Sequence, residues 1–131
     1  MPHIVIEHSA NLAELTDIGE LVEAVHAAAL DDGLPALDAL RTRAVSRQHY
    51  RIADGNPAYG FVYLTARIGP GREPAAVERF LTRLMDTVDE ALAPLLPDNP
   101  VALSAEIQLI EPSQRIMRNH IRTHLDQADG S

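Results

Sequence analysis

The chain has 131 residues, a formal net charge of −8, 46% hydrophobic residues and no cysteine. This length and composition predict one globular domain with its own core. The negative charge disfavours nucleic acid and anionic membranes as partners, and no apolar run reaches the ~18 residues of a membrane span. The lack of cysteine excludes disulfides, thiol catalysis and cysteine metal sites, and no secretory signal is evident, so we expect a cytoplasmic protein.

The first half of the chain predicts a β-α-β unit. Residues 3–8 form a short apolar β run, and residues 37–45 can form a second strand. Between them we expect a helix with Asn11 or Thr16 as its cap and Gly33 at its end. Its apolar residues recur at steps of three and four: Leu15, Ile18, Val22, Val25 and Ala29.

The second half repeats this plan. Residues 59–68 predict a strand rich in aromatic and β-branched side chains, and residues 101–110 predict another. A helix is expected from about Pro74 to Ala93 between them, because proline suits a first helical turn. The tail is predicted to hold a short helix around residues 115–125.

The expected fold is therefore α/β, with a single domain over residues 1–131. It comprises two β-α-β units, at about 2–45 and 59–110, and a C-terminal tail at 112–131. Each unit pairs its strands in parallel, and the two helices can cover only one face of a four-stranded sheet. The strands carry apolar residues on both sides, and we expect a second subunit to cover the other face.

Pro2 is the first candidate for chemistry. An initiator methionine followed by proline is normally removed, so we expect a mature chain that begins with a free secondary amine. All 11 basic residues are arginine, so this terminus is the only amine in the protein. Burial and nearby cations would lower its pKa from about 8 toward neutrality, where it could act as a general base.

Arginine residues are the candidate anion binders. Arg41 and Arg43 share one face of a predicted strand, and Arg72 follows a glycine-proline turn. Arginines in a cleft could bind a dicarboxylate and depress the pKa of the amine, although a single arginine is more often a surface charge. His120 and His124 have the spacing of metal ligands, but no third ligand accompanies them, so we predict no metal site.

Five segments together resemble 5-carboxymethyl-2-hydroxymuconate Δ-isomerases, which belong to the tautomerase superfamily. They extend over nearly the whole chain: Met1–Glu7, Leu40–Arg43, Ala53–Gly55, Tyr59–Arg72 and Leu103–Ile107.

The resemblance implies a homotrimer of β-α-β-β-α-β subunits, each with a four-stranded mixed sheet and two helices on one face. It also implies an enzyme that transposes C=C bonds without cofactor or metal. Pro2 would be the general base. Arg41 and Arg72 would bind and polarise an anionic dienol, and a neighbouring subunit could supply one of the two. Arg43 is a weaker candidate. The implied reaction is a step in the breakdown of homoprotocatechuate (4-hydroxyphenylacetate).

Two alternatives stay open. The chain could act on a different unsaturated 2-oxo or 2-hydroxy acid, because the same proline and arginines would serve that chemistry. It could instead be a non-catalytic trimeric binding or scaffold protein of the same fold.

Overall fold

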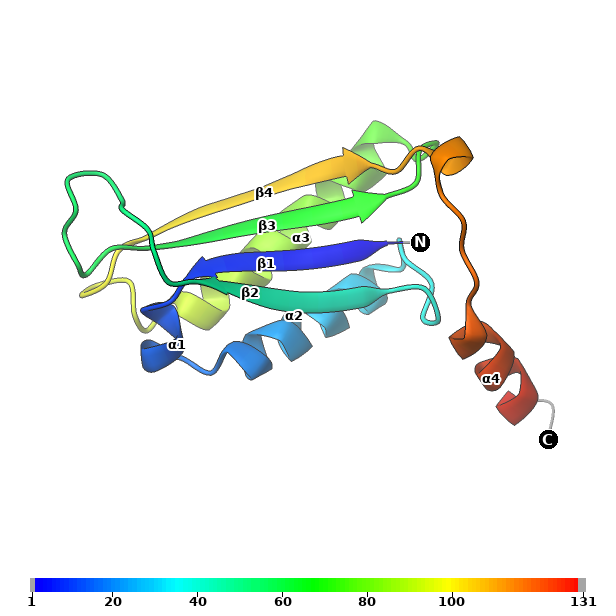
Figure 1. The fold of residues 1–131 in the computed structure, drawn as a ribbon, viewed down its shortest axis with the longest axis horizontal. Helices are drawn as coiled ribbons and strands as arrows, with labels where there is room; N and C mark the ends of the chain where they lie inside the picture. The colour runs from blue at the N-terminus through cyan, green and yellow to red at the C-terminus, as the bar shows by residue number, and fades with distance from the viewer. Residues whose placement is uncertain (1, 130–131) are drawn as a thin grey trace.

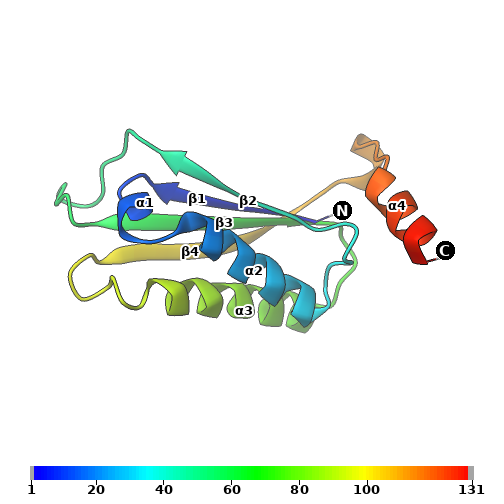
Figure 2. The same ribbon diagram turned by 90° about the horizontal axis from the view of Figure 1, so that it is seen from below.

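The computed structural model describes residues 2–129, which form one four-stranded sheet covered on one face by two long helices (Figures 1 and 2). No helix in this part of the chain is long and apolar enough to cross a bilayer. The elements in chain order are β1 (His3–Ser9), α1 (Leu12–Leu15), α2 (Ile18–Asp32), β2 (Arg41–Arg47), β3 (Gly60–Ile68), α3 (Pro74–Leu92), β4 (Val101–Leu109), the 3-10 turn η1 (Pro112–Gln114) and α4 (His120–Asp129).

The sheet has the strand order β2-β1-β3-β4. β1 pairs with β2 in parallel, β3 pairs with β4 in parallel, and the two central strands β1 and β3 are antiparallel. The mixed sheet of two β-α-β units is thereby confirmed. β1 and β2 begin, and β3 and β4 finish, at the same end of the sheet, where the chain's N-terminus lies (Figure 1). We call this the N-terminal edge of the sheet.

The core lies between the sheet and helices α2 and α3 (Figure 2). Even-numbered residues of β1 and β3 point toward the helices, because successive side chains of a strand alternate between its faces. Members of this cluster that are almost fully buried include Ile4, Ile6, Val25, Val62, Leu64, Phe80, Leu84, Val88 and Leu92.

The start of the first long helix differs from the prediction. Neither Asn11 nor Thr16 caps α2; the Asp17 carboxylate does, accepting a hydrogen bond from the Glu20 N–H at 3.1 Å. The reason is the extended backbone of Thr16, which separates the single turn α1 from α2. The predicted helix end is correct, because Gly33 adopts the left-handed conformation with φ of 87°.

Two other boundaries shift. The second strand begins at Arg41 rather than at residue 37, because Ala39 and Leu40 donate backbone hydrogen bonds to Ala36 in a turn. The tail helix begins at His120 rather than near residue 115. Asn119 sets that start, since its side-chain oxygen accepts hydrogen bonds from the N–H groups of the residues two and three positions later.

The uncovered face of the sheet is less apolar than expected. Val5, Val45, Phe61 and Tyr63 are half-buried there, but they alternate or pair with charged and polar residues. These are Glu7, Arg41, Arg43, Thr65, Arg67, Ser104 and Glu106. The open face is thus suited to polar as well as apolar contacts.

Truncation of the central core side chain tests this description. Phe80 is fully buried, so we expect Phe80→Ala to lower the free energy of unfolding by about 3–5 kcal/mol. Thr82→Ala, on the exposed side of the same helix, should change it by no more than about 0.5 kcal/mol. Urea denaturation measures both, and equal effects would contradict the packing of α3.

Candidate active site

Pro2 lies at the entrance to the central strand β1. The residue is buried, and its carbonyl oxygen accepts a hydrogen bond from the Arg41 N–H at 3.3 Å. Strand β1 is flanked by β2 and β3, so Pro2 lies at the end of a central strand and not of an edge strand. The expected removal of Met1 lies outside the described residues.

His3 brings two of the predicted arginines together. It pairs with Arg41 across β1 and β2, and Arg43 lies two residues further along the same face. The guanidinium Nη1 of Arg41 lies 3.2 Å from His3 Nε2, and Nη1 of Arg43 lies 3.1 Å from His3 Nδ1. A neutral imidazole accepts at only one nitrogen, so one guanidinium faces an N–H. The cluster has too few acceptors for its donors.

The pKa of His3 is lowered from its ordinary value. Burial of the ring is the largest cause, followed by the positive charges of Arg43, Arg41 and Arg67. The lowered pKa leaves the ring neutral at pH 7, because its ordinary value is about 6.5. The imidazole therefore adds no positive charge to the guanidinium groups around it.

A cavity of about 380 Å³ adjoins these residues. Its lining comes partly from the sheet, through His3, Arg41 and Arg67, and partly from residues after β4. No carboxylate lines it, and the ion pairs recorded within residues 2–129 involve other arginines: Arg47, Arg79, Arg83 and Arg122. The lining residues after β4 are Ile110, Arg115, Ile116, Met117 and Arg118.

The cavity therefore holds four guanidinium groups in a protein of net charge −8. Guanidinium groups bind carboxylates through paired hydrogen bonds, so the arrangement favours a ligand with several carboxylates. Pro2 directly precedes His3, which lines the cavity, and it is hydrogen-bonded through its carbonyl oxygen to the backbone of Arg41. Cations lower the pKa of a neighbouring amine. Among the described residues, no group of three His, Asp or Glu side chains is placed to hold a metal ion.

Arg72 does not line this cavity. It follows β3, and its guanidinium donates to the carbonyl oxygens of Gly69 at 3.2 Å and Leu34 at 3.3 Å. It borders a separate groove of about 730 Å³ between α3 and β4, with Leu81 and Leu109 among its lining residues. Within one chain the structure thus brings Arg41 and Arg43 together with His3 and leaves Arg72 apart.

Four polar residues of the cavity were not predicted as site residues. His3 and Arg67 could have been found from the two-residue period of the strands, which puts them on the same face as Arg41 once the strand order is known. Arg115 and Arg118 had no such signal, because they lie in irregular chain between η1 and α4.

Comparison with known proteins assigns the family. The family model for 5-carboxymethyl-2-hydroxymuconate isomerase matches residues 2–125. The 5-carboxymethyl-2-hydroxymuconate Delta-isomerase of Escherichia coli is 28% identical over 121 residues, which are 92% of this chain and 96% of the relative.

Solved structures agree with this assignment. A 5-carboxymethyl-2-hydroxymuconate delta-isomerase crystal structure is 30% identical, with a TM-score of 0.85 over 95% of this chain and 93% of the other. The 5-carboxymethyl-2-hydroxymuconate isomerase of Deinococcus radiodurans is 26% identical, with a TM-score of 0.87 and the same two coverages. More distant tautomerase-superfamily structures, 15–18% identical, share the fold alone with TM-scores of 0.56–0.63. The chain therefore belongs to the 5-carboxymethyl-2-hydroxymuconate isomerase family.

Proposed function

We propose that the protein isomerises 5-carboxymethyl-2-hydroxymuconate to 5-carboxy-2-oxohept-3-enedioate, with Pro2 as the general base. The observation that carries this proposal is the position of Pro2, which is buried next to His3 and hydrogen-bonded to the backbone of Arg41, two residues that line the arginine-rich cavity. Family membership supplies the substrate class, since the matching relatives are named for this isomerisation.

The reaction moves one proton and changes no atom count. The Pro2 amine takes the proton of the substrate hydroxyl, and the oxygen becomes a ketone as its O–H bond breaks. The two conjugated C=C bonds are replaced by a single C=C bond at the position between them. The displaced electron pair goes to the carbon that bears the carboxymethyl group. That carbon takes the proton back from the prolinium. A base with a pKa near neutrality suits both transfers, and general acid–base catalysis contributes about 10²–10⁴-fold.

Arg41 is proposed to bind a substrate carboxylate and to stabilise the negative charge that develops on the oxygen. Its place in the cavity and its contact with His3 support this role. Arg43 is the weaker candidate, because it contacts His3 and is not among the cavity residues. It would hold the imidazole in place and add positive potential.

Arg72 is proposed to act on the site of a neighbouring subunit. Its separation from the cavity of its own chain supports that arrangement. A closed ring of three identical subunits would bring one surface of each chain to a different surface of the next. We propose such a homotrimer, without cofactor, acting in the cytoplasm in homoprotocatechuate breakdown.

Two competing functions make different predictions. A relative that acts on another unsaturated 2-oxo or 2-hydroxy acid would turn that acid over faster than 5-carboxymethyl-2-hydroxymuconate. A non-catalytic scaffold would bind polycarboxylates without turnover, even with a free terminal proline. Intact mass of the native protein comes first, because a retained methionine would convert the Pro2 amine into an amide and leave only the scaffold function. If the methionine is absent, turnover decides between the scaffold and the enzyme.

A blocked terminus should abolish catalysis. We expect a short uncleaved N-terminal extension to lower kcat by at least about 100-fold, because an amide nitrogen cannot accept the proton. Protease removal of the same extension, leaving Pro2 first, should restore the rate. The melting temperature of the purified protein serves as the control for folding. Full activity of the extended chain would remove Pro2 from the mechanism.

Mixed oligomers test the origin of Arg72. We expect Arg72→Gln chains and N-terminally extended chains each to be inactive alone. Co-expressed in equal amounts, they should regain about one quarter of the wild-type sites. A site is then active only where an Arg72→Gln chain, which supplies Pro2, lies next to an extended chain, which supplies Arg72. No recovery would place Arg72 in the site of its own chain, and an active Arg72→Gln enzyme would exclude it from the reaction.

The titration of His3 reports on ligand binding. In the free protein its pKa is lowered, chiefly by burial and then by the three arginines. A bound anion stabilises the imidazolium, so saturating tricarballylate should raise this pKa, and affinity should increase as pH falls through it. NMR titration of the ring signals measures the change, with His49 in the loop at the other end of the sheet as the control (Figure 1). An unchanged His3 titration at saturation would place the anion elsewhere.

A further inference from the structure

Residues 110–119 connect β4 to α4 and include the 3-10 turn η1. This segment crosses the end of the sheet at which the N-terminus lies (Figure 1). We call it the strap. It leaves β4 at one border of the sheet and reaches α4 near the other border, by β2. Figure 2 shows α4 beyond the end of the sheet, away from α2 and α3. The strap therefore faces the same edge as Pro2.

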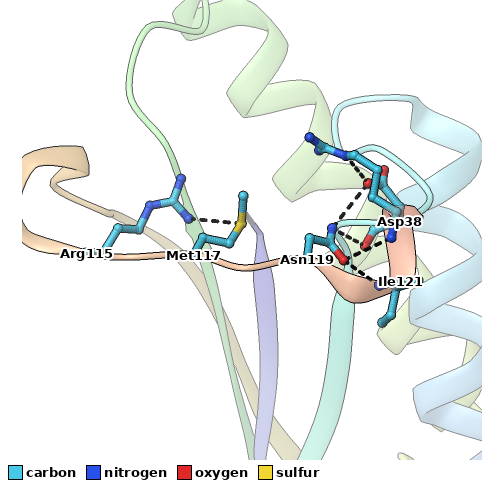
Figure 3. A network of polar contacts seen from close by, with 6 residues as sticks. Asp38, Arg115, Met117, Asn119 and Ile121 are labelled. Atoms are coloured by element: carbon cyan, nitrogen blue, oxygen red, sulfur yellow. Dashed lines mark hydrogen bonds and ion pairs between the residues drawn. The ribbon is translucent and has the colours of Figure 1, made fainter. Parts of the chain in front are cut away.

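Polar contacts hold the strap at both ends. At its start, the Ile110 N–H donates to the Ile68 carbonyl oxygen at 2.8 Å. At its finish, the Asn119 amide donates to the Asp38 carbonyl oxygen at 3.0 Å and to its carboxylate at 3.2 Å. Arg122 pairs with the same carboxylate at 2.5 Å (Figure 3). Asp38 thus serves as the anchor of the strap.

The Asp38 anchor is ionised at neutral pH. The hydrogen bond from Arg122 is the main cause that lowers the pKa of the Asp38 carboxyl. By contrast, apolar burial contributes little to the strap, since the side chain of Ile116 is 88% exposed. The position of the strap therefore depends on this ionic and hydrogen-bonded anchor.

Arg115 and Arg118 bring the strap's positive charge to the cavity. Both line it, together with His3, Arg41 and Arg67 of the sheet. The Arg115 guanidinium contacts the sulfur of Met117 at 3.9 Å, which is a weak acceptor, as Figure 3 shows. Neither arginine takes part in an ion pair recorded among the described residues. Their donors are available to an anion that enters the cavity.

We infer that Arg115 and Arg118 determine specificity by binding the carboxylate of the substrate's carboxymethyl side arm. The sheet arginines bind the carboxylates of the muconate skeleton. This inference rests on the proposed function for the identity of the substrate. A muconate has a carboxylate at each end, and the carboxymethyl group adds a third. The cavity offers cations from two separate elements, Arg41 and Arg67 from the sheet and Arg115 and Arg118 from the strap. Without the strap, only the sheet arginines would remain.

A pair of unreactive acids tests the inference separately from catalysis. Tricarballylate and glutarate share a five-carbon chain with terminal carboxylates, and only tricarballylate carries a middle one. We expect the wild-type protein to bind tricarballylate about tenfold or more tightly, since a charge-assisted contact to arginine is the difference. The double variant Arg115→Gln/Arg118→Gln should bind the two acids within about twofold of each other. Isothermal titration calorimetry measures all four affinities.

Matched variants distinguish position from charge. Arg79→Gln/Arg83→Gln removes two charges from α3 and should keep the tenfold preference. Asp38→Asn removes the charge of the anchor while the strap arginines remain, and should weaken the preference without changing glutarate binding. A preference that survives Arg115→Gln/Arg118→Gln, or is lost equally in the α3 pair, would overturn the inference.

Turnover gives a second readout. The strap double variant should lose about 10–100-fold in kcat/KM for 5-carboxymethyl-2-hydroxymuconate, and change little for 2-hydroxymuconate, which lacks the side arm. Arg41→Gln should affect both substrates. Failure of the wild type to turn over either substrate would contradict the proposed function, while the affinities for tricarballylate and glutarate would still decide the role of the strap.

Discussion

The central position of β1 is the constraint on which the rest of the site depends. Because β1 pairs with β2 on one side and β3 on the other, its first residues cannot fray as an edge strand would. The register sets Arg41 and Arg67 on either side of His3 in one row across the sheet. An amine that must deliver a proton to a chosen carbon needs such a fixed position, because a displacement of about 1 Å can cost 100-fold in rate.

Charge is distributed unevenly over this molecule. The chain carries 19 acidic and 11 basic residues, and a solvated anion would be repelled by most of its surface. The cavity concentrates arginines without a carboxylate among them, so it provides a local region of positive potential. Such a region attracts an anion only when the anion comes close, within about 10 Å at moderate ionic strength. An acidic surface with one basic cavity thus discriminates against anions that make few contacts.

Local sequence patterns predicted the elements well where a strand or helix buries one side. The alternation of apolar residues identified β1 and β3, and the step of three to four residues identified α2 and α3. The boundaries at Asp17 and Arg41 were missed because they depend on a side-chain cap and on pairing with a distant strand. Pro2 and Arg41 stood out in the sequence as candidate site residues, whereas the strap arginines did not. Their position depends on Asp38, which is 81 residues from Asn119 in the chain, and no periodic pattern encodes that contact.

The polar attachment of the strap has a consequence for how this fold can diversify. Insertions and deletions are tolerated best in segments that bury little apolar surface and carry no sheet hydrogen bonds along their length. The strap meets that description between its two attachments, and lengthening a loop costs only about 0.6 kcal/mol per doubling. Its length could therefore change during evolution and alter the size of ligand admitted, while the proline and the sheet beneath it stay as they are.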